Sequence, residues 1–206
     1  MKISYAITVC NEFVEIQNLI PFLLKHKRSE DEIVVLYDSK NGDSKIEEFL
    51  RAKSINAEFQ WFKDEFDGHF ANWKNKLTDF CGGDWIFQID ADEIPNEVLI
   101  TNLHEILLGN DVDVILVPRV NTVEGLTDEH IQKWGWNVDE KGWVNWPDYQ
   151  YRLYRKSDDI KWKNKVHEVL EGYKRISQLP VVEALSLYHP KEIERQEKQN
   201  AYYDTL

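Results

Sequence analysis

Cysteine is nearly absent from this chain of 206 residues, which contains only Cys10 and Cys81. Their spacing is not that of a metal site, and two cysteines are too few for a disulfide framework, so we expect reduced thiols. Long apolar runs are missing as well. No stretch approaches the roughly 20 residues of a membrane span, and residues 3–9 are too short and too β-branched for a signal peptide. These absences predict a cytoplasmic protein without a membrane span.

Positive charge is also in deficit. The chain has 25 lysines and arginines against 37 aspartates and glutamates, which gives a formal net charge of −12. Because phosphate-rich partners favour a basic face, this balance argues against a nonspecific binder of nucleic acid or of a membrane surface. Hydrophobic residues make up 42% of the chain, which is enough for one well-packed core, so we interpret residues 1–206 as a single domain.

Strand and helix patterns alternate over the first half of the chain. Short apolar runs predict strands at residues 3–9, 32–37, 57–62, 85–89 and 112–117, and helical spacing predicts helices at residues 16–27, 46–50, 70–80 and 96–108. This order predicts an α/β fold with a Rossmann-like, mostly parallel sheet flanked by helices. In such a sheet, ligands bind outside the carboxyl ends of the strands.

Residues 82–95 read G-G-D-W-I-F-Q-I-D-A-D-E-I-P, a short buried strand that ends in an acidic cluster. Asp90 and Asp92 are two residues apart, so in an extended chain both carboxylates leave the backbone on the same side. Mg²⁺ or Mn²⁺ would relieve their mutual repulsion by taking oxygen ligands from both, and a diphosphate would complete its shell. The alternative is that Asp92 caps a surface helix whose first turn contains Pro95.

Polar residues follow three of the predicted strands. Asn11 and Glu12 come after the first strand, Asp38 comes after the second, and residues 90–92 come after the strand at 85–89. Because the carboxyl ends of parallel strands share one edge of a sheet, we expect these groups to converge on one crevice.

The second half of the chain is irregular and rich in aromatic residues. Five of its positions between residues 134 and 162 are tryptophan, namely Trp134, Trp136, Trp143, Trp146 and Trp162. Their rings could form a small core beneath long loops or an exposed platform on which sugar rings stack. We predict a strand from residue 149 onward, another at residues 181–188, and a charged helix from residue 190 to the end.

Several segments together carry a family resemblance. They are the strand followed by C-N-E, the strand that ends at Asp38, the helix F-A-N-W-K-N, the segment G-D-W-I-F-Q-I-D-A-D-E, and Y-R-L-Y-R-K followed by K-V-H-E. In these segments the chain resembles the family 2 glycosyltransferases of the GT-A fold, nearest to short bacterial and phage enzymes related to lipopolysaccharide-core glucosyltransferases. The resemblance covers most of the chain and is strongest at residues 1–95 and 149–171.

This resemblance implies a nucleotide-sugar donor, a UDP-sugar, bound with Mn²⁺ or Mg²⁺ by residues 1–117, and a carbohydrate or glycolipid acceptor at residues 118–206. It implies that Asp38 binds the base or ribose, that Asp90 lies near the ribose and the metal, and that Asp92 is the principal metal ligand. The donor crevice would also be lined by Thr8, Asn11, Glu12, Asn75 and Ala91, with Lys74 where the family usually has arginine. The alternative for Asn75 is a solvated helix face.

The chain departs from the family at the catalytic base. Many inverting members carry a Glu-Asp pair on a later helix, and the second half here has Val166-His167-Glu168 instead. Our candidate base is Glu168, and His167 is a competing base or a metal ligand; both residues could instead be structural. The family often supplies a final metal ligand from a histidine near the carboxyl end, so His189 is another candidate ligand. The alternative is that His189 is a neutral, hydrogen-bonded histidine at a strand end. A base at Glu168 predicts direct displacement with inversion at the anomeric carbon.

Three other functions compete with this one. A nucleotidyltransferase needs a Gly- and Arg-rich loop after the first strand, where this chain reads C-N-E-F-V-E. A noncatalytic carbohydrate-binding module would leave Asp38, Asp90 and Asp92 unexplained. A phage enzyme that glycosylates modified DNA bases is disfavoured by the acidic charge, although a basic stretch at residues 152–165 keeps it open. The acceptor could thus be a lipid-linked sugar, an oligosaccharide, a protein or a base.

Overall fold

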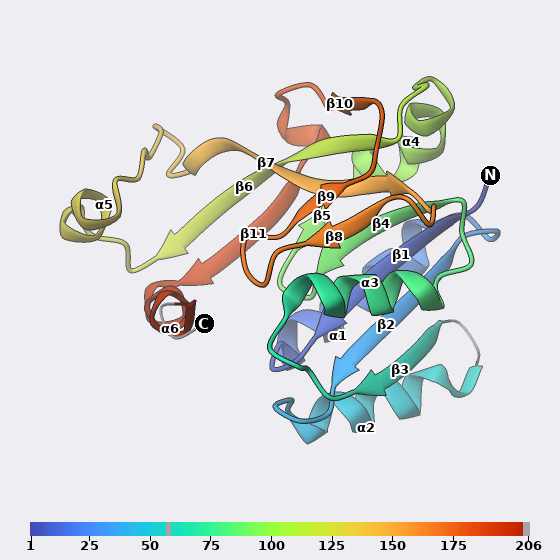
Figure 1. Cartoon of the computed structure of the whole chain (residues 1–206). Helices are drawn as coiled ribbons and strands as arrows, with labels where there is room; N and C mark the ends of the chain where they lie inside the picture. Colours follow the sequence, from blue (N-terminus) through green and yellow to red (C-terminus); the bar gives the residue numbers. More distant parts are fainter. Residues whose placement is uncertain (57–58, 204–206) are drawn as a thin grey trace.

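The computed structural model describes residues 1–56 and 59–203 and confirms the predicted α/β fold (Figure 1). The first half contains β1 (Ile3–Val9), α1 (Phe13–His26), β2 (Glu32–Asp38), α2 (Ser44–Lys53), the 3₁₀ turn η1 (Ser54–Asn56), β3 (Gln60–Asp64), α3 (Phe70–Phe80), β4 (Trp85–Asp90), β5 (Ile94–Pro95) and α4 (Glu97–Leu108). The strand predicted at 57–62 begins at Gln60, and residues 57–58 lie outside the described residues.

The second half continues the same sheet. It contains β6 (Val114–Glu124), α5 (Asp128–Trp134), β7 (Val144–Arg155), β8 (Lys161–Lys163), β9 (Val169–Glu171), β10 (Ile176–Gln178), the 3₁₀ turn η2 (Glu183–Leu185), β11 (Leu187–Glu192) and α6 (Ile193–Tyr203). The strand order is β3-β2-β1-β4-β7-β6-β11-β5, with β10 beside β6. Neighbours among β1 to β4 are parallel, and β7 is antiparallel to both β4 and β6. The sheet is therefore mostly parallel, with one long antiparallel strand at its centre.

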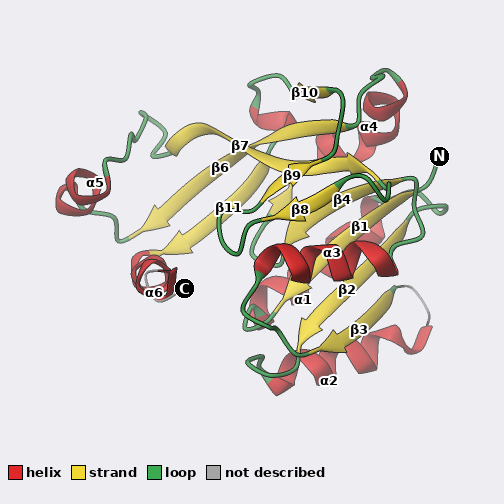
Figure 2. Ribbon diagram, in the orientation of Figure 1, coloured by secondary structure: helices red, strands yellow, loops and turns green. Residues whose placement is uncertain are grey.

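Two apolar layers cover the sheet. Successive side chains of a strand point to opposite faces, so Trp85 and Phe87 of β4 pack on one side and Ile86 packs on the other. The first layer contains the buried faces of α1, α2 and α4, and the second contains α3 with the β8–β9 hairpin. Figure 2 shows α3 and this hairpin lying side by side over the sheet. The hairpin thereby carries the segment at residues 166–168 toward the strand ends.

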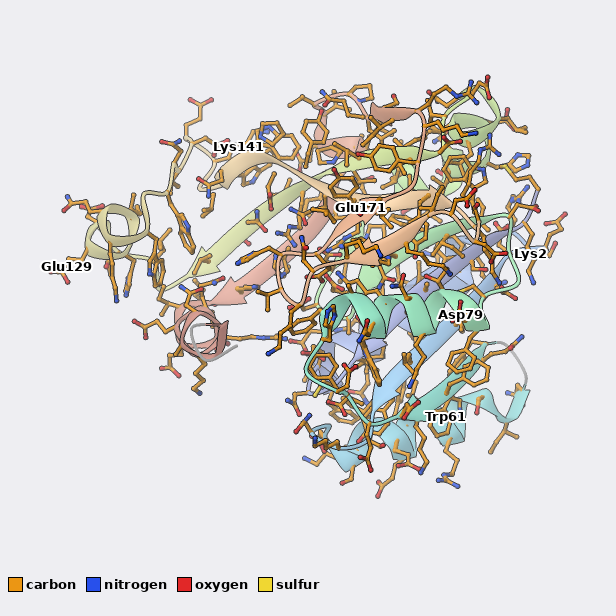
Figure 3. All side chains as sticks on the ribbon, in the orientation of Figure 1. Lys2, Trp61, Asp79, Glu129, Lys141 and Glu171 are labelled. Carbon is orange, nitrogen blue, oxygen red and sulfur yellow. The ribbon has the colours of Figure 1, made fainter. Side chains whose placement is uncertain are left out.

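An arm made of the end of β6, α5 and the start of β7 extends away from the core, with Glu129 on α5 and Lys141 near the start of β7 (Figures 1 and 3). Four of the five clustered tryptophans lie in this arm. Trp162 is buried in the second apolar layer, whereas the other four tryptophans are half-buried and contact one another in pairs. The pairs are Trp134 with Trp136 and Trp143 with Trp146.

Two predictions for the last part of the chain are wrong. The apolar run at residues 181–188 forms η2 and then a strand that extends to Glu192, so Pro190 lies within β11 and the last helix begins only at Ile193. β5 pairs only with Leu187 and Tyr188, which leaves the rest of β11 at an edge of the sheet, where a proline without an N–H is tolerated.

The strand predicted at 112–117 is also too short, and the strand predicted from residue 149 begins too late. β6 continues to Glu124 and β7 begins at Val144, and the two pair along most of their length with two register shifts. Polar and aromatic side chains interrupt the apolar pattern in this region, so periodicity did not detect the strands. The pairing places residues 119–124 and 148–152 beside the functional site.

Gly83 provides a test of how tightly the start of β4 packs. A Cβ at Gly83 would lie 2.7 Å from the backbone nitrogen of Ser4, whereas a Cβ at Gly82 would meet only side-chain atoms at 3.4 Å or more. We expect Gly83→Ala to destabilise the protein by about 1–3 kcal/mol, because β1 must shift. Gly82→Ala should change the free energy of unfolding by less than about 1 kcal/mol. Urea denaturation of both variants measures this difference, and equal effects would contradict the packing argument.

Candidate active site

The strands β1, β2 and β4 end side by side, and the structure brings together the polar groups that follow them. Thr8 pairs with Asp90 in the register of β1 and β4, and its hydroxyl lies 3.3 Å from the Asp90 carboxylate. Cys10 after β1 contacts Asp38 at the end of β2, with 3.7 Å between the thiol sulfur and the carboxylate. The next residue, Asn11, is exposed at this edge.

Asp38 is buried and serves as an acceptor for several donors. Its carboxylate accepts hydrogen bonds from the backbone N–H of Lys40 at 2.9 Å, the side-chain amide of Asn41 at 2.8 Å and the backbone N–H of Phe66 at 3.2 Å. These bonds fix the turn after β2 and the approach to α3. The Cys10 thiol beside it has its pKa raised to about 12, first by burial and then by the negative charge of Asp38, so this thiol is not a nucleophile.

Asp90 is part of a buried ion cluster with Glu93 and Arg152. The Arg152 guanidinium is 3% exposed and donates to Asp90 at 2.6 Å and to Glu93 at 2.7 Å. Glu93 also accepts from the backbone N–H of Asp90 at 3.2 Å, so this carboxylate orients the loop that follows β4. Burial raises the pKa of Asp90, but the charges of Arg152 and Lys74 outweigh it and bring the pKa to about 2. Asp90 is therefore ionised at neutral pH.

Asp92 lies beside the first part of β11 and α6. Its Oδ2 is 3.4 Å from Nε2 of His189 and 3.3 Å from the Arg195 guanidinium, which also donates to Glu12 at 2.9 Å. The alternative role for Asp92 as a helix cap is wrong, since α4 is capped by Asn96, whose side chain accepts from the N–H of Val98. Ala91 is buried between the two aspartates and donates its N–H to the carbonyl of Thr8 at 3.2 Å.

Glu168 reaches the same site through Lys74. The Lys74 ammonium lies over the Trp162 ring, 2.5 Å from the Glu168 carboxylate and 3.9 Å from that of Asp90. Lys74 is 6% exposed, so it joins the two carboxylates beneath the surface. The neighbouring His167 is exposed and has a positive φ of 54°, a conformation in the left-handed region.

Asn75 holds the hairpin against α3. Its side-chain amide donates to the carbonyl of Trp162 at 3.0 Å and accepts from the N–H of Trp162 at 2.9 Å. Both polar atoms of the side chain are thus engaged with β8. This gives Asn75 a structural role, and its contact with a donor stays a prediction.

The chemistry of Asp92 and His189 suits a divalent cation that is shared with a ligand. An aspartate oxygen and an imidazole nitrogen are acceptable to Mn²⁺, and Asp90 adds a second carboxylate at the same strand end. In residues 1–56 and 59–203, no group of three or more His, Cys, Asp or Glu side chains is arranged to hold a metal ion by itself. A cation here would therefore need further ligands from a bound diphosphate and water.

Sequence reasoning missed four side chains of the site. They are Glu93, Arg119, Asp148 and Arg195. Arg119 donates to Glu93 at 2.9 Å and to Asp148 at 2.7 Å, which continues the ion cluster into β6 and β7. Nothing in the local sequence indicates the contacts of Arg195, because they depend on where α6 lies.

A mostly parallel sheet with carboxylates at the ends of β1, β2 and β4, extended by antiparallel strands, defines the GT-A class of folds. Two solved structures of TarS residues 1–349 from S. aureus share it. The complex with UDP matches with a TM-score of 0.62 and 17% identity, covering 92% of this chain and 60% of TarS 1–349. The complex with UDP-GlcNAc matches with a TM-score of 0.63 and 16% identity, covering 93% and 59%. At these identities the likeness concerns the fold alone.

The chain belongs to glycosyl transferase family 2, whose family model matches residues 4–176. It is also similar to two curated relatives, the glycosyltransferase SunS of Bacillus phage SPbeta and the SPbeta prophage-derived glycosyltransferase SunS of Bacillus subtilis (strain 168). Each is 24% identical over 190 residues, which is 91% of this chain and 39% of the relative. The chain therefore spans about two fifths of the length of these relatives. None of the helices among the described residues has the length and apolar composition that crossing a membrane requires.

The ion cluster predicts a large difference between two arginine variants. Arg152→Ala leaves the carboxylates of Asp90 and Glu93 without their shared cation, and we expect a loss of about 3–5 kcal/mol in the free energy of unfolding. Arg51→Ala removes an exposed (i, i+4) pair with Glu47 and should cost less than about 1 kcal/mol. Denaturant titrations of both variants measure these values. A similar small loss in both would mean that the Arg152 cluster does not support the fold.

Proposed function

We propose that the chain is a metal-dependent glycosyltransferase domain that moves a sugar from a UDP-sugar to an acceptor hydroxyl with inversion of the anomeric carbon. The observation that carries this proposal is the link between Asp90, Lys74 and Glu168, which sets a strand-end carboxylate beside a candidate base. Asp92 and His189 lie at the same edge of the sheet. A carbohydrate-binding module has no need for this arrangement.

The donor nucleotide is proposed to lie over the ends of β1 and β2. Family membership supports a nucleotide-sugar donor, and the TarS complexes with UDP and UDP-GlcNAc support uracil as its base. Thr8, Asn11, Glu12 and Asp38 follow these strands and would line the crevice. The free thiols of Cys10 and Cys81 suit a reducing compartment such as the cytoplasm.

Mn²⁺ or Mg²⁺ would be held by Asp92, with Asp90 and His189 as further ligands. When bound, such a cation supplies a Lewis acid that stabilises the negative charge of the departing diphosphate. Arg152 and Lys74 keep Asp90 ionised and oriented before the donor arrives. Arg195 supplies positive charge between Glu12 and Asp92, which stabilises these two carboxylates at close range.

The acceptor oxygen is proposed to lose its proton to Glu168. As the new bond from this oxygen to the anomeric carbon forms, the bond from that carbon to the diphosphate breaks and its electron pair stays on the diphosphate. Lys74 orients the Glu168 carboxylate at 2.5 Å. A carbohydrate or glycolipid acceptor would find stacking surfaces on the half-buried tryptophans of the arm.

Asp92→Ala tests the metal role. We expect Mn²⁺-dependent release of UDP from a panel of UDP-sugars to fall at least about 100-fold, because the proposed cation loses its principal ligand. The matched control is Asp79→Ala, which removes a carboxylate on α3 that is 69% exposed (Figure 3). Slow transfer to water makes the assay independent of the acceptor. Undiminished metal-dependent release by a folded Asp92→Ala protein would exclude this ligand assignment.

Glu168→Gln tests the base. Removal of a general base typically lowers kcat by about 10²–10⁴-fold, and we expect this loss in transfer to an acceptor with little change in KM for the donor. The control is Glu171→Gln on the same hairpin, where the side chain is exposed. NMR of the product gives the anomeric configuration. Retention of the donor configuration, or full activity of Glu168→Gln, would rule out direct displacement with Glu168 as the base.

A further inference from the structure

The imidazole of His189 contacts a different polar group at each of its nitrogens. Nδ1 lies 2.8 Å from Oδ1 of Asn121, and Nε2 lies 3.4 Å from Oδ2 of Asp92. His189 is only 7% exposed, so water contributes little to its environment. The position of the ring proton therefore depends on these two neighbours.

The orientation of the Asn121 amide is determined by Asp148. The Nδ2 atom of Asn121 donates to Oδ2 of Asp148 at 2.8 Å, and the same carboxylate accepts two bonds from Arg119, at 2.9 Å and 2.7 Å. A carboxylate paired with a guanidinium can only accept hydrogen bonds. The amide nitrogen must therefore face Asp148, and the amide oxygen must face His189.

This orientation selects one tautomer of the neutral ring. Oδ1 of Asn121 only accepts, so Nδ1 of His189 must carry the hydrogen. Nε2 is then the nitrogen that faces Asp92, 3.4 Å from its Oδ2. Histidines that bind metals usually donate their second N–H to an oxygen in this way, which fixes the tautomer and the ring orientation.

We propose that Asn121 is a positioning residue that, oriented by Asp148 and Arg119, holds the hydrogen of His189 on Nδ1 and so directs Nε2 toward Asp92, where a divalent cation shared by the two side chains would bind. The inference rests on the proposed function for the identity of that cation. The tautomer itself is a property of the protein without metal or donor. The same Arg119 also donates to Glu93, so one guanidinium orients both the Asp90 loop and the His189 ring.

The tautomer can be measured directly in the metal-free protein. NMR of the ¹⁵N-labelled histidine rings at mildly alkaline pH distinguishes a protonated Nδ1 from a protonated Nε2, and His189→Gln assigns the signal by its loss. We expect wild-type His189 to carry its hydrogen on Nδ1. A neutral ring that carries its hydrogen on Nε2 would overturn the proposal. This measurement needs no variant beyond the one used for assignment.

Two variants test the chain of hydrogen bonds. Asn121→Ala should shift His189 toward the Nε2–H form and weaken Mn²⁺ binding, measured by calorimetry with Mn²⁺ alone and with Mn²⁺ and UDP, by about 10–100-fold. Asp148→Asn lets the Asn121 amide turn over, so we expect a mixture of tautomers and a smaller loss. The control is Asn102→Ala, whose side chain bonds the Val98 carbonyl on the exposed side of α4.

The outcomes separate this inference from the proposed function. If Asn121→Ala keeps the Nδ1–H tautomer and the wild-type affinity for Mn²⁺, the positioning role is wrong even where donor turnover is metal-dependent. If no UDP-sugar is turned over but His189 has the Nδ1–H tautomer that Asn121→Ala abolishes, the positioning role stands and the transferase proposal fails.

Discussion

The buried Arg152 guanidinium, shared by Asp90 and Glu93, is the interaction on which the site depends. Glu93 is fully buried and Asp90 is partly buried, and the two carboxylates need a cation here because isolated buried charges lose far more solvation than packing returns. Arg152 comes from β7, the antiparallel strand inserted beside β4. The position of β7 beside β4 therefore supplies the positive charge, on Arg152, that the carboxylates of the acidic motif require.

A continuous series of ion pairs and hydrogen bonds includes this guanidinium and crosses β4, β7, β6 and β11. It begins at Asp90 and ends at Asp92, in the same acidic motif. In order, the members are Asp90, Arg152, Glu93, Arg119, Asp148, Asn121, His189 and Asp92. Each contact joins residues from β4 and its following loop, β7, β6 or β11. These contacts hold both aspartates of the loop after β4 against neighbouring strands. A buried network is most specific when its members are satisfied, and Nε of Arg152 is a buried atom without a hydrogen-bond partner among the described residues.

The sequence predicted the parallel half well because its strands are buried on both faces and its helices keep a clear apolar stripe. It also placed Asp38, Asp90 and Asp92 at strand ends, where the topology puts them on one edge. The second half, where β7 runs antiparallel to its neighbours, was harder to predict. β6, β7 and β11 carry Arg119, Asp148 and His189 inward, so polar residues fill positions that periodicity expects to be apolar. Their partners are distant in sequence, and only the completed sheet brings them together.

Ion pairs offset the negative charge of the site, which bears on how an acidic edge could accept a negatively charged donor. The chain is acidic overall, and a nucleoside diphosphate would bring more negative charge to an edge that already holds Glu12, Asp90 and Asp92. Asp90 is balanced by Arg152 and Lys74, and Glu12 is balanced by Arg195, which also approaches Asp92. Arg152, Lys74 and Arg195 are thereby engaged with carboxylates, and Lys191 adds positive charge near Asp92. For the proposed donor, a divalent cation beside Asp92 would add further positive charge for the phosphates.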